Sequence, residues 1–440
     1  MVKNIYAAAL ALTSATLLSI SVQAQNFGTT RGLPTRPELP TTASGTPGRN
    51  CATTEVLNAQ LAADPAQKLR MDAIEAQTRR AIAGGRTQTN FTASGAVITI
   101  PVVVHVLYNT AAQNISDAQV QSQIDVLNED FRKLNADRSK TPAAFAGVAA
   151  DIGIQFKLAT VDPTGAPTNG IIHKYTKTAS WSTNDAVKNS KRGGDNAWPA
   201  GQYLNMWACN LGQGLLGYAQ FPGGAASTDG VVCLYSAFGS RAKFPAGTYT
   251  STYDIGRTTT HEVGHWLNLR HIWGDASCGN DLVSDTPTQQ TSNYGCPTYP
   301  HVTCANQGDM SMNYMDYTDD ACMYMFSSGQ SARMNALFAS GGARASLLTS
   351  TAAGAARTSA PVASAVSIYP NPAASVLNLT NLSAPAQTSV RVYSLQGAEM
   401  RQARYDGRGH LQVQSLPRGL YYLDVTDASG HTSHQRFEKE

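Results

Sequence analysis

The segment THEVGHWLNLRH, residues 260–271, holds three of the chain's nine histidines and one glutamate. His261 and His265 are four residues apart, so they share one face if the segment is helical. Two imidazoles on one face suit a metal ion, and Glu262 between them suits a general base acting on a metal-bound water. Catalytic zinc takes three protein ligands, and His271 supplies the third if the chain turns sharply after the helix. The pattern therefore predicts a zinc site that activates water.

A second segment, SMNYMDYTDDACM at residues 311–323, fits the same site. Met315 would form an apolar floor beneath the imidazoles, and Tyr317 two residues later is placed to hydrogen-bond an oxyanion. The alternatives are an ordinary core methionine and an amphipathic helix with polar histidines. The third histidine, six residues after the second, favours the metal site.

Hydrophobic patterns predict the elements that position these residues. Residues 95–109 are rich in β-branched side chains and indicate a buried strand, as do residues 151–162 and 202–211. Residues 115–135 predict an amphipathic helix whose apolar stripe comprises Val120, Ile124, Leu127 and Phe131. This order favours an α/β fold with a long helix behind a mixed sheet.

Both ends of the chain differ from this central part. Residues 1–24 combine Lys3, an apolar run and a small-residue cleavage pattern, which indicates an export signal peptide. A membrane helix is the alternative, but the apolar run is short and lacks a charged stop. We expect the mature protein to be soluble. Residues 350–364 predict a small-residue linker, and residues 365–440 hold short strands separated by turns, as in a small all-β sandwich.

Composition narrows the partners. The formal net charge of +3 is too small to indicate nucleic acid or an anionic membrane as a partner. The chain has seven cysteines, and in an exported protein we expect them to pair where geometry allows. An odd number leaves at least one thiol with another task. Cys209 and Cys233, in two predicted strands, form either a disulfide or two buried thiols.

Five strings in this order and spacing resemble the pappalysin family of metzincin metallopeptidases, in its cytophagalysin and ulilysin-like branch: LNMWACNLGQGLLGYAQFPGG, DGVVCLYSAFG, THEVGHWLNLRHIWG, VSDTPTQ and GDMSMNYMDYTDDACMYMFSSGQSARM. The resemblance covers roughly residues 95–348. It implies a metzincin-like α/β (α+β) catalytic domain over residues 91–349, with a mixed twisted sheet, a zinc helix and a Met-turn. The implied activity is zinc-dependent hydrolysis of peptide bonds in proteins. The family's glycine is Asn268 here, and asparagine also tolerates the left-handed conformation such a turn needs.

Four cysteines lie between the zinc-helix segment and the end of the Met-turn segment: Cys278, Cys296, Cys304 and Cys322. Spacing alone allows three pairings. The resemblance implies disulfides between Cys278 and Cys304 and between Cys296 and Cys322.

The string GNDLVSDTPTQ brings the side-chain oxygens of Asp281, Asp285 and Thr286 close together. Ordinary turn chemistry explains such a cluster, but its spacing also suits a calcium shell. The resemblance favours a structural calcium ion, with the carbonyl of Val283 as a further ligand.

The resemblance also implies a preference for arginine or lysine directly after the scissile bond. Asp320 is the residue we match to the family's pocket acid, with Asp319 as the second choice. The alternative is that both are surface or calcium-shell carboxylates.

Residues 25–90 are expected to form a pro-segment. GRNCATTEVLNAQLAADP resembles the family's pro-segment motif, although Asn50 is inserted and Ala52 replaces a glycine. A thiolate at Cys51 would take the open zinc position and keep the enzyme latent, as a cysteine switch. The alternative is an unpaired or intermolecular cysteine. Three arginines in the expected mobile connection offer cleavage sites for activation: Arg79, Arg80 and Arg86.

The unit at residues 365–440, which begins VSIYPNPA, resembles the C-terminal sorting domain of the type IX secretion system. The resemblance implies export through the periplasm to the cell surface or medium, with that machinery as a partner. A carbohydrate-binding or adhesive sandwich is the alternative.

Two functions of different classes remain. The first is a secreted zinc endopeptidase made as a latent zymogen, and the second is a secreted binding or adhesion protein with an inactive peptidase domain. An inactive descendant is free to lose its general base, but Glu262 is present. The intact set of residues favours the enzyme.

Overall fold

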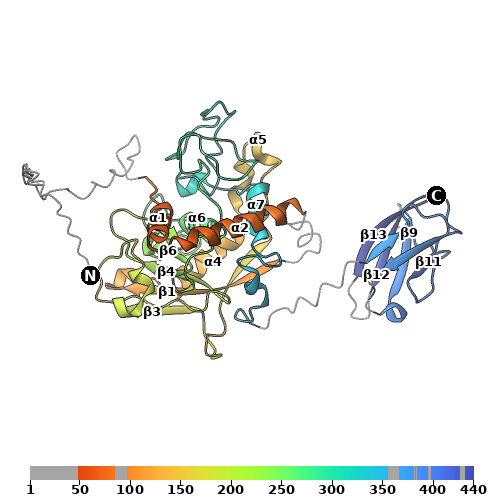
Figure 1. Ribbon diagram of the computed structural model, residues 1–440, viewed down its shortest axis with the longest axis horizontal. Helices are drawn as coiled ribbons and strands as arrows, with labels where there is room; N and C mark the ends of the chain where they lie inside the picture. The colour runs from red at the N-terminus through yellow and green to blue at the C-terminus, as the bar shows by residue number, and fades with distance from the viewer. Residues whose placement is uncertain are drawn as a thin grey trace, which may run out of the picture. The chain divides into compact units, whose positions relative to one another are not determined.

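The computed structural model describes residues 48–84, 97–354, 366–380, 382, 384–394, 398–426 and 432–440 (Figure 1). The predicted signal peptide, Arg86 and most of the predicted linker lie outside these residues.

The described part of the predicted pro-segment consists of two helices, α1 (Thr53–Ala63) and α2 (Ala66–Ala83). Figure 1 shows α2 as a long helix crossing the body of the molecule. Arg79 and Arg80 lie within α2. The expectation of a mobile, cleavable connection at these two arginines is therefore wrong, because the Ala, Glu and Gln content of this segment favours a continuous helix.

The central sheet has six strands in the order β2-β1-β4-β6-β5, and β3 also pairs with β1. The strands are β1 (Ile98–Tyr108), β2 (Ile154–Leu158), β3 (Ile171–Tyr175), β4 (Leu204–Cys209), β5 (Gly217–Ala219) and β6 (Val231–Leu234). All pairs are parallel except β5 with β6. The predicted mixed sheet is confirmed, and its antiparallel strand β5 lies at one edge.

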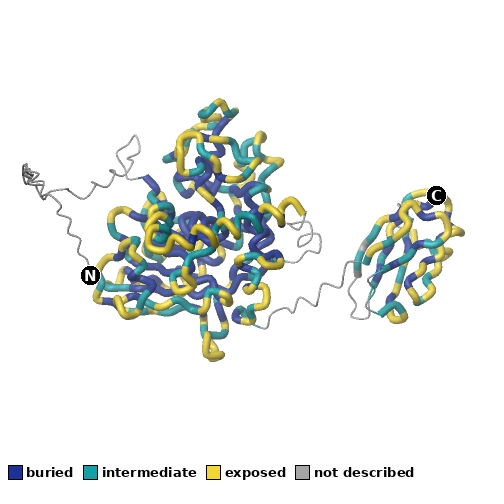
Figure 2. The backbone as a smooth tube through the Cα atoms, viewed as in Figure 1, coloured by how far each residue is buried: buried dark blue, intermediate teal, exposed yellow. Residues whose placement is uncertain are grey.

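Helices α4 (Asp117–Phe131) and α6 (Arg257–Trp266) pack on one face of this sheet. Alternate residues of β1, such as Val102, Val104 and Val106, enter the main core with the predicted stripe of α4. Figure 2 shows the buried chain concentrated at this centre. The two other helices of this part are α5 (Ala143–Ala146) and α7 (Ser328–Ala336).

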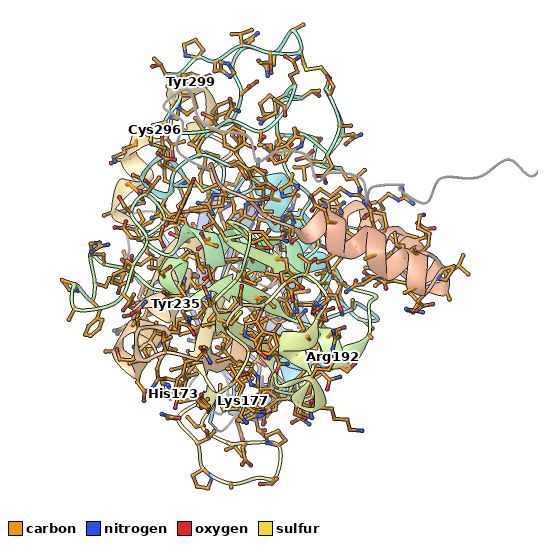
Figure 3. All side chains as sticks on the ribbon, turned by 90° about the vertical axis from the view of Figure 1, so that its left-hand side faces the viewer. His173, Lys177, Arg192, Tyr235, Cys296 and Tyr299 are labelled. Atoms are coloured by element: carbon orange, nitrogen blue, oxygen red, sulfur yellow. A yellow bond between two sulfur atoms is a disulfide. The ribbon has the colours of Figure 1, made fainter. Side chains whose placement is uncertain are left out.

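A long region with little regular structure connects α6 to α7, and it contains Cys296 and Tyr299 (Figure 3). The structure forms disulfides Cys278–Cys304 and Cys296–Cys322, the same two pairs that the family resemblance implied. Each closes a loop with a sequence separation of 26 residues. Such cross-links stabilise mainly by restricting the unfolded chain.

Cys209 and Cys233 are free and buried. They lie on adjacent parallel strands, where Ala208 is aligned with Cys233 and Cys209 with Leu234. Neighbouring side chains on a strand point to opposite faces, so the two thiols lie on opposite sides of the sheet. The structure therefore resolves the alternative in favour of two buried thiols.

The C-terminal part is a sandwich of two antiparallel sheets, with strand orders β10-β11-β8-β7 and β13-β12-β9. The strands are β7 (Ser367–Tyr369), β8 (Val376–Thr380), β9 (Ser389–Ser394), β10 (Arg404–Tyr405), β11 (His410–Gln412), β12 (Gly419–Thr426) and β13 (Thr432–Lys439). Leu377 and Leu411 of one sheet share a core with Leu423 and Phe437 of the other. The predicted all-β sandwich is confirmed.

Within the described residues, no helix has both the length and the apolar character needed to cross a bilayer.

Candidate metal centre

Helix α6 carries the central histidine motif. It begins after Gly256, whose φ is 88°. The hydroxyl of Thr260 on this helix donates a 2.7 Å hydrogen bond to the carboxylate of Asp130 on α4. The helix ends at Trp266, and Asn268 then has φ 70° while the amide of Leu269 bonds back to the carbonyl of Gly264. The predicted left-handed turn at asparagine is thus confirmed, and it reverses the chain toward His271.

Each of the three histidines has its Nδ1 atom fixed by an acceptor. His261 Nδ1 lies 2.7 Å from the carbonyl oxygen of Tyr314, and His265 Nδ1 lies 2.8 Å from that of Leu269. His271 Nδ1 lies 2.5 Å from Asp275 Oδ1. Since these oxygens only accept, all three Nδ1 atoms carry the proton. The Nε2 atoms are left with free lone pairs.

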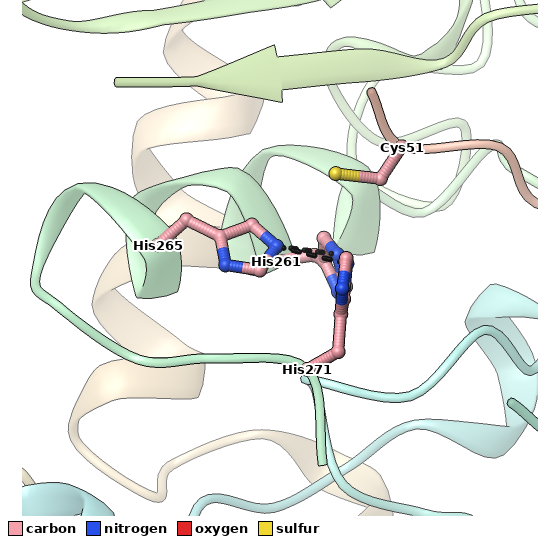
Figure 4. A group of neighbouring side chains, drawn as sticks. All are labelled: Cys51, His261, His265 and His271. Carbon is pink, nitrogen blue, oxygen red and sulfur yellow. Dashed lines mark hydrogen bonds between the residues drawn. The ribbon is translucent and has the colours of Figure 1, made fainter. Parts of the chain in front are cut away.

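Those three Nε2 atoms face one another (Figure 4). His265 Nε2 lies 3.1 Å from the Nε2 atoms of both His261 and His271. Burial lowers the pKa of His261, and it lowers that of His265 to about 3, so both rings are neutral. Three converging lone pairs with no proton between them suit a cation. Zinc binds imidazole nitrogens at about 2.0–2.1 Å, which in a tetrahedral site spaces the nitrogens about 3.3 Å apart. The 3.1 Å separations observed here are close to that spacing.

Cys51 completes the cluster. One ligand atom from each of Cys51, His261, His265 and His271 lies within 4.8 Å of all the others, and all four residues are buried. Figure 4 shows the thiol directed toward the imidazoles. Burial is the main cause that raises the pKa of this thiol, followed by the charge of Glu262. A neighbouring cation would favour the thiolate instead.

Glu262 lies beside this cluster with 1% of its surface exposed. Its Oε2 atom accepts hydrogen bonds from Cys51 Sγ at 3.5 Å and from Thr53 Oγ1 at 3.1 Å. Burial raises the pKa of its carboxyl to about 8, although both hydrogen bonds oppose that shift. A carboxyl with this pKa is suited to gain and lose a proton near neutral pH.

Met315 and Tyr317 flank the histidines as the sequence predicts. Met315 is fully buried, and a Cβ atom added to Gly264 would lie 2.4 Å from its sulfur, so the methionine packs directly against α6. The ring of Tyr317 contacts those of His261 and His271, and its hydroxyl donates to the carbonyl of Cys51 at 3.1 Å.

The pro-segment lies along the free edge of β5. The amide of Leu216 donates to the carbonyl of Asn50, and the amide of Ala52 donates to that of Gly217, each at 3.0 Å. Thr53 Oγ1 then accepts from the amide of Ala219 at 2.8 Å. The segment around Cys51 therefore pairs with this edge through a short parallel bridge, in the way an added strand would begin.

Asp320 forms a buried ion pair with Arg49 of the pro-segment. Arg49 Nη2 is 2.5 Å from Asp320 Oδ1, and both side chains are 1% exposed. The other carboxylate oxygen accepts from the amides of Ile255 and Arg257 at the start of α6, each at 3.1 Å. Asp319, the second choice, is only partly buried and makes no such ion pair with Arg49.

The predicted calcium residues divide into two groups. Asp281 accepts from the amide of Val283 and from the hydroxyl of Thr286, which also donates to the carbonyl of Val283. The carboxylate of Asp285 instead accepts from Ser327 and from the amide of Gly329 at the start of α7.

Three residues at the site were not assigned a role from the sequence: Arg49, Thr53 and Asp275. The spacing of Asp275, four residues after His271, was the available signal for a carboxylate that holds the His271 ring. Arg49 and Thr53 belong to the pro-segment motif that this stretch resembles, but their contacts at the site depend on the tertiary path of the pro-segment.

Residues 187–339 match the peptidase family model described as Pregnancy-associated plasma protein-A, and residues 367–437 match that of the secretion system C-terminal sorting domain. An extracellular metalloprotease of Pyricularia oryzae is 33% identical over 289 residues, which cover 63% of this chain and 87% of that protein.

Solved structures of Tannerella forsythia proteins are also similar. Mature mirolysin in complex with a cleaved peptide is 52% identical, with a TM-score of 0.57, over 60% of this chain and 99% of that one. A promirolysin mutant is 47% identical, with a TM-score of 0.61, over 68% of this chain and 97% of that one. The family match, the curated relative and these structures agree with the geometry of the site, and the chain belongs to the pappalysin family of zinc metalloendopeptidases.

Proposed function

We propose that this chain is the latent precursor of a secreted zinc endopeptidase that uses Glu262 as general base and prefers arginine or lysine directly after the scissile bond. His261, His265 and His271 would hold the zinc. The observation that carries the proposal is the convergence of three Nε2 lone pairs beside a buried carboxyl group.

The chemistry assigns separate tasks to the residues around the histidines. A zinc ion bound there would polarise the scissile carbonyl and lower the pKa of the attacking water. Glu262 removes a proton from that water at Oε2, the oxygen that Cys51 and Thr53 contact in the precursor, and later gives a proton to the leaving amine. The hydroxyl of Tyr317, once released from the carbonyl of Cys51, would donate to the substrate oxygen as negative charge develops.

The edge of β5 is suited to bind an extended peptide. Backbone groups of Leu216, Gly217 and Ala219 bond to residues 50–53 of the precursor, and they become available once this segment leaves. A protein or peptide substrate would take its place by the same backbone hydrogen bonds. The mature mirolysin structure holds a cleaved peptide, which supports a peptide substrate for this relative.

Arg49 supports the proposed specificity because it occupies the Asp320 position as a basic substrate side chain would. Its guanidinium also donates to the carbonyl of Thr318 and the hydroxyl of Thr258 and lies over the ring of Tyr253. A planar guanidinium thus finds a carboxylate, neutral acceptors and an aromatic face in one buried position. A lysine side chain would retain the charge but would lose the planar arrangement of several N–H donors.

Latency would depend on three contacts of the same short segment. Cys51 would take the open metal position, and Arg49 is paired with Asp320. Thr53 donates a hydrogen bond to the carboxyl of Glu262, the proposed general base. The resemblance to promirolysin supports a zymogen. Cutting the segment away would release all three positions together.

The sorting-domain match supports export and recognition by a secretion machinery, which we propose is the type IX system. The relatives named extracellular metalloproteases support a secreted or surface-attached enzyme. We propose transit through the periplasm, guided by the N-terminal signal peptide.

We also propose a structural calcium ion at the loop of residues 279–289. The clustering of oxygens from Asp281, Val283 and Thr286 supports this site, and Asp285 would have to turn from α7 to join them. Thermal melting with and without calcium tests it: calcium should raise the melting temperature of the parent and not that of Asp281→Asn. An equal response in both would contradict the site.

The alternative of an inactive binding protein predicts no turnover. The experiment that separates the two is casein cleavage by the processed protein. We expect cleavage that a chelator abolishes and added zinc restores, whereas intact casein under all conditions would favour the binding protein.

A further inference from the structure

Helix α2 meets the catalytic part through an ion pair between Glu75 and Arg333. Arg333 of α7 directs both terminal nitrogens at Glu75, with Nη1 3.1 Å from Oε1 and Nη2 2.9 Å from Oε2. The side chain of Arg333 is 3% exposed and that of Glu75 is 20% exposed. This bidentate, largely buried geometry is the strong form of a guanidinium–carboxylate contact.

Arg333 is also held by the catalytic part itself. The same two nitrogens lie 3.4 Å from the carbonyl oxygens of Leu282 and Asn268, which belong to the loop after α6 and the turn that ends it. Its Nε atom has no hydrogen-bond partner among the described residues. The guanidinium is therefore positioned by groups that remain after the pro-segment leaves.

The rest of the α2 contact combines polar and apolar groups. Gln77 donates to the carbonyl of Ala336, Ala81 packs with Ala336 and Ala339, and Arg70 donates to the carbonyl of Gly223. The large apolar side chain of Leu69 is 72% exposed instead of buried in the contact. Ile74 of α2 packs against the main core, so apolar contacts hold this helix as well, and the Glu75 carboxylate is the charged group that Arg333 recognises.

Within the described residues, the polar groups of this contact are incompletely satisfied. Gln77 Oε1, Thr78 Oγ1 and Asn268 Nδ2 are buried without hydrogen-bond partners. Buried polar groups are normally paired, so the match between α2 and this surface is not optimal. A segment bound in this way is suited to exchange with another one.

We propose that Arg333 forms a carboxylate-binding exosite, which Glu75 occupies in the precursor and which an acidic side chain of a helical segment in a protein substrate occupies in the processed enzyme. This inference rests on the proposed removal of the pro-segment. Removal of α2 uncovers the guanidinium and takes away its bidentate carboxylate, while the carbonyls of Leu282 and Asn268 keep it in position to bind another carboxylate. Among the described residues, Asp281 also interacts with Arg333, but burial raises the pKa of its carboxyl to about 6 and its oxygens already accept from Val283 and Thr286.

The exosite is formed by residues other than the metal-binding histidines, and part of it lies on the turn that follows α6. Asn268, which contributes a carbonyl to it, comes three residues after His265 and immediately before Leu269, whose carbonyl holds His265 Nδ1. In the precursor, one chain occupies both places at once, with Cys51 at the histidines and Glu75 at Arg333. A folded or partly helical substrate is able to do the same.

The probe is the 18-residue peptide of segment 66–83 in three labelled forms: parent, Glu75→Gln and Asp72→Asn. Asp72 is the matched control, because it pairs with Lys68 on the exposed face of the same helix. The receptor is the enzyme carrying Glu262→Ala, processed in trans by a trace of the parent enzyme, so that the peptide is bound without being cut. Anisotropy measures the dissociation constants.

We expect the parent and Asp72→Asn peptides to bind equally, and the Glu75→Gln peptide to bind about tenfold more weakly or worse. On the enzyme side, Arg333→Lys should weaken the parent peptide more than the Glu75→Gln peptide, which a double-mutant cycle reports even if the fold is somewhat less stable. Equal binding of the Glu75→Gln and Asp72→Asn peptides would overturn the exosite.

A second readout links the exosite to turnover. A reporter peptide with segment 66–83 attached should have a several-fold lower KM than its Glu75→Gln form, with the same kcat. Equal KM values in a fully active enzyme would overturn the exosite alone. Absence of turnover in the parent, with the peptide still bound, would overturn the proposed function alone.

Discussion

Arg49 and Asp320 form a fully buried ion pair between the pro-segment and the residues just after the Met-turn, with 2.5 Å between Nη2 and Oδ1. A buried charge requires a partner, so removing the pro-segment leaves the Asp320 carboxylate facing an emptied, partly desolvated position. An arginine side chain of a substrate restores the same contact. This pair therefore connects latency and specificity in one position.

Replacing Asp320 by asparagine should lower the preference for arginine after the scissile bond by about tenfold or more, because a charged hydrogen-bonded contact contributes about 1.5–3 kcal/mol. Cleavage of a peptide library before and after the substitution measures the change. Asp319→Asn is the control, since this neighbour is only partly buried. If the arginine preference falls in the Asp319 variant and stays unchanged in the Asp320 variant, Asp319 is the pocket acid and Asp320 is not.

Cys51→Ala should give a precursor that activates itself earlier than the parent, since the thiol no longer occupies the metal position. Arg49 and Thr53 keep their contacts, so we expect faster activation and not a fully active precursor. N-terminal sequencing over time follows the cut. Cys209→Ala removes a buried thiol outside the site and should leave the rate unchanged. Equal latency of the Cys51 variant and the parent would make Cys51 structural.

Asp275→Asn should weaken zinc binding by about tenfold, because the carboxylate that fixes the His271 ring loses its charge. Asparagine tolerates the left-handed backbone at this position, where φ is 57°, so the fold should survive. Competition with a chromogenic chelator measures the affinity. Asp254→Asn, which removes an ion pair with Arg241 outside the cluster, is the control. Unchanged affinity would mean that packing against Trp273 and Tyr317 holds the ring without the charge of the carboxylate.

Gly264→Ala should destabilise the precursor by about 1–3 kcal/mol, because the added Cβ would lie 2.4 Å from the sulfur of Met315. Thermal melting reports the loss. Gly147→Ala is the matched control, since no atom lies within 4 Å of the Cβ that it would add. Equal melting temperatures would show that Met315 moves aside without cost.

The parts of the fold that follow from local periodicity could be predicted from the sequence. The stripe of α4 and the i, i+4 histidines of α6 depend on positions a few residues apart, and both predictions place the side chains correctly. Asn268 is similar, because its left-handed backbone follows from the intrinsic tolerance of asparagine. Local chemistry decides all three.

Other features depend on tertiary contacts that spacing does not report. Arg49 and Asp320 are separated by 271 positions, and their contact requires the path of the pro-segment along β5. The opposite orientation of Cys209 and Cys233 depends on a strand register offset of one residue, which strand prediction does not fix. Arg79 and Arg80 lie within α2 because the helix propensity of their neighbours extends the helix through the place where we expected a mobile connection.

The measurement that tests the central claim most directly determines turnover and bound zinc together in processed Glu262→Ala. The substitution removes the group that moves protons and leaves the three Nε2 ligands and their Nδ1 acceptors in place. We therefore predict one zinc per chain, as in the parent, with turnover lower by about 10²–10⁴-fold. Turnover at the parent rate would remove Glu262 from the mechanism, and loss of the zinc would show that Glu262 is a ligand instead of the base.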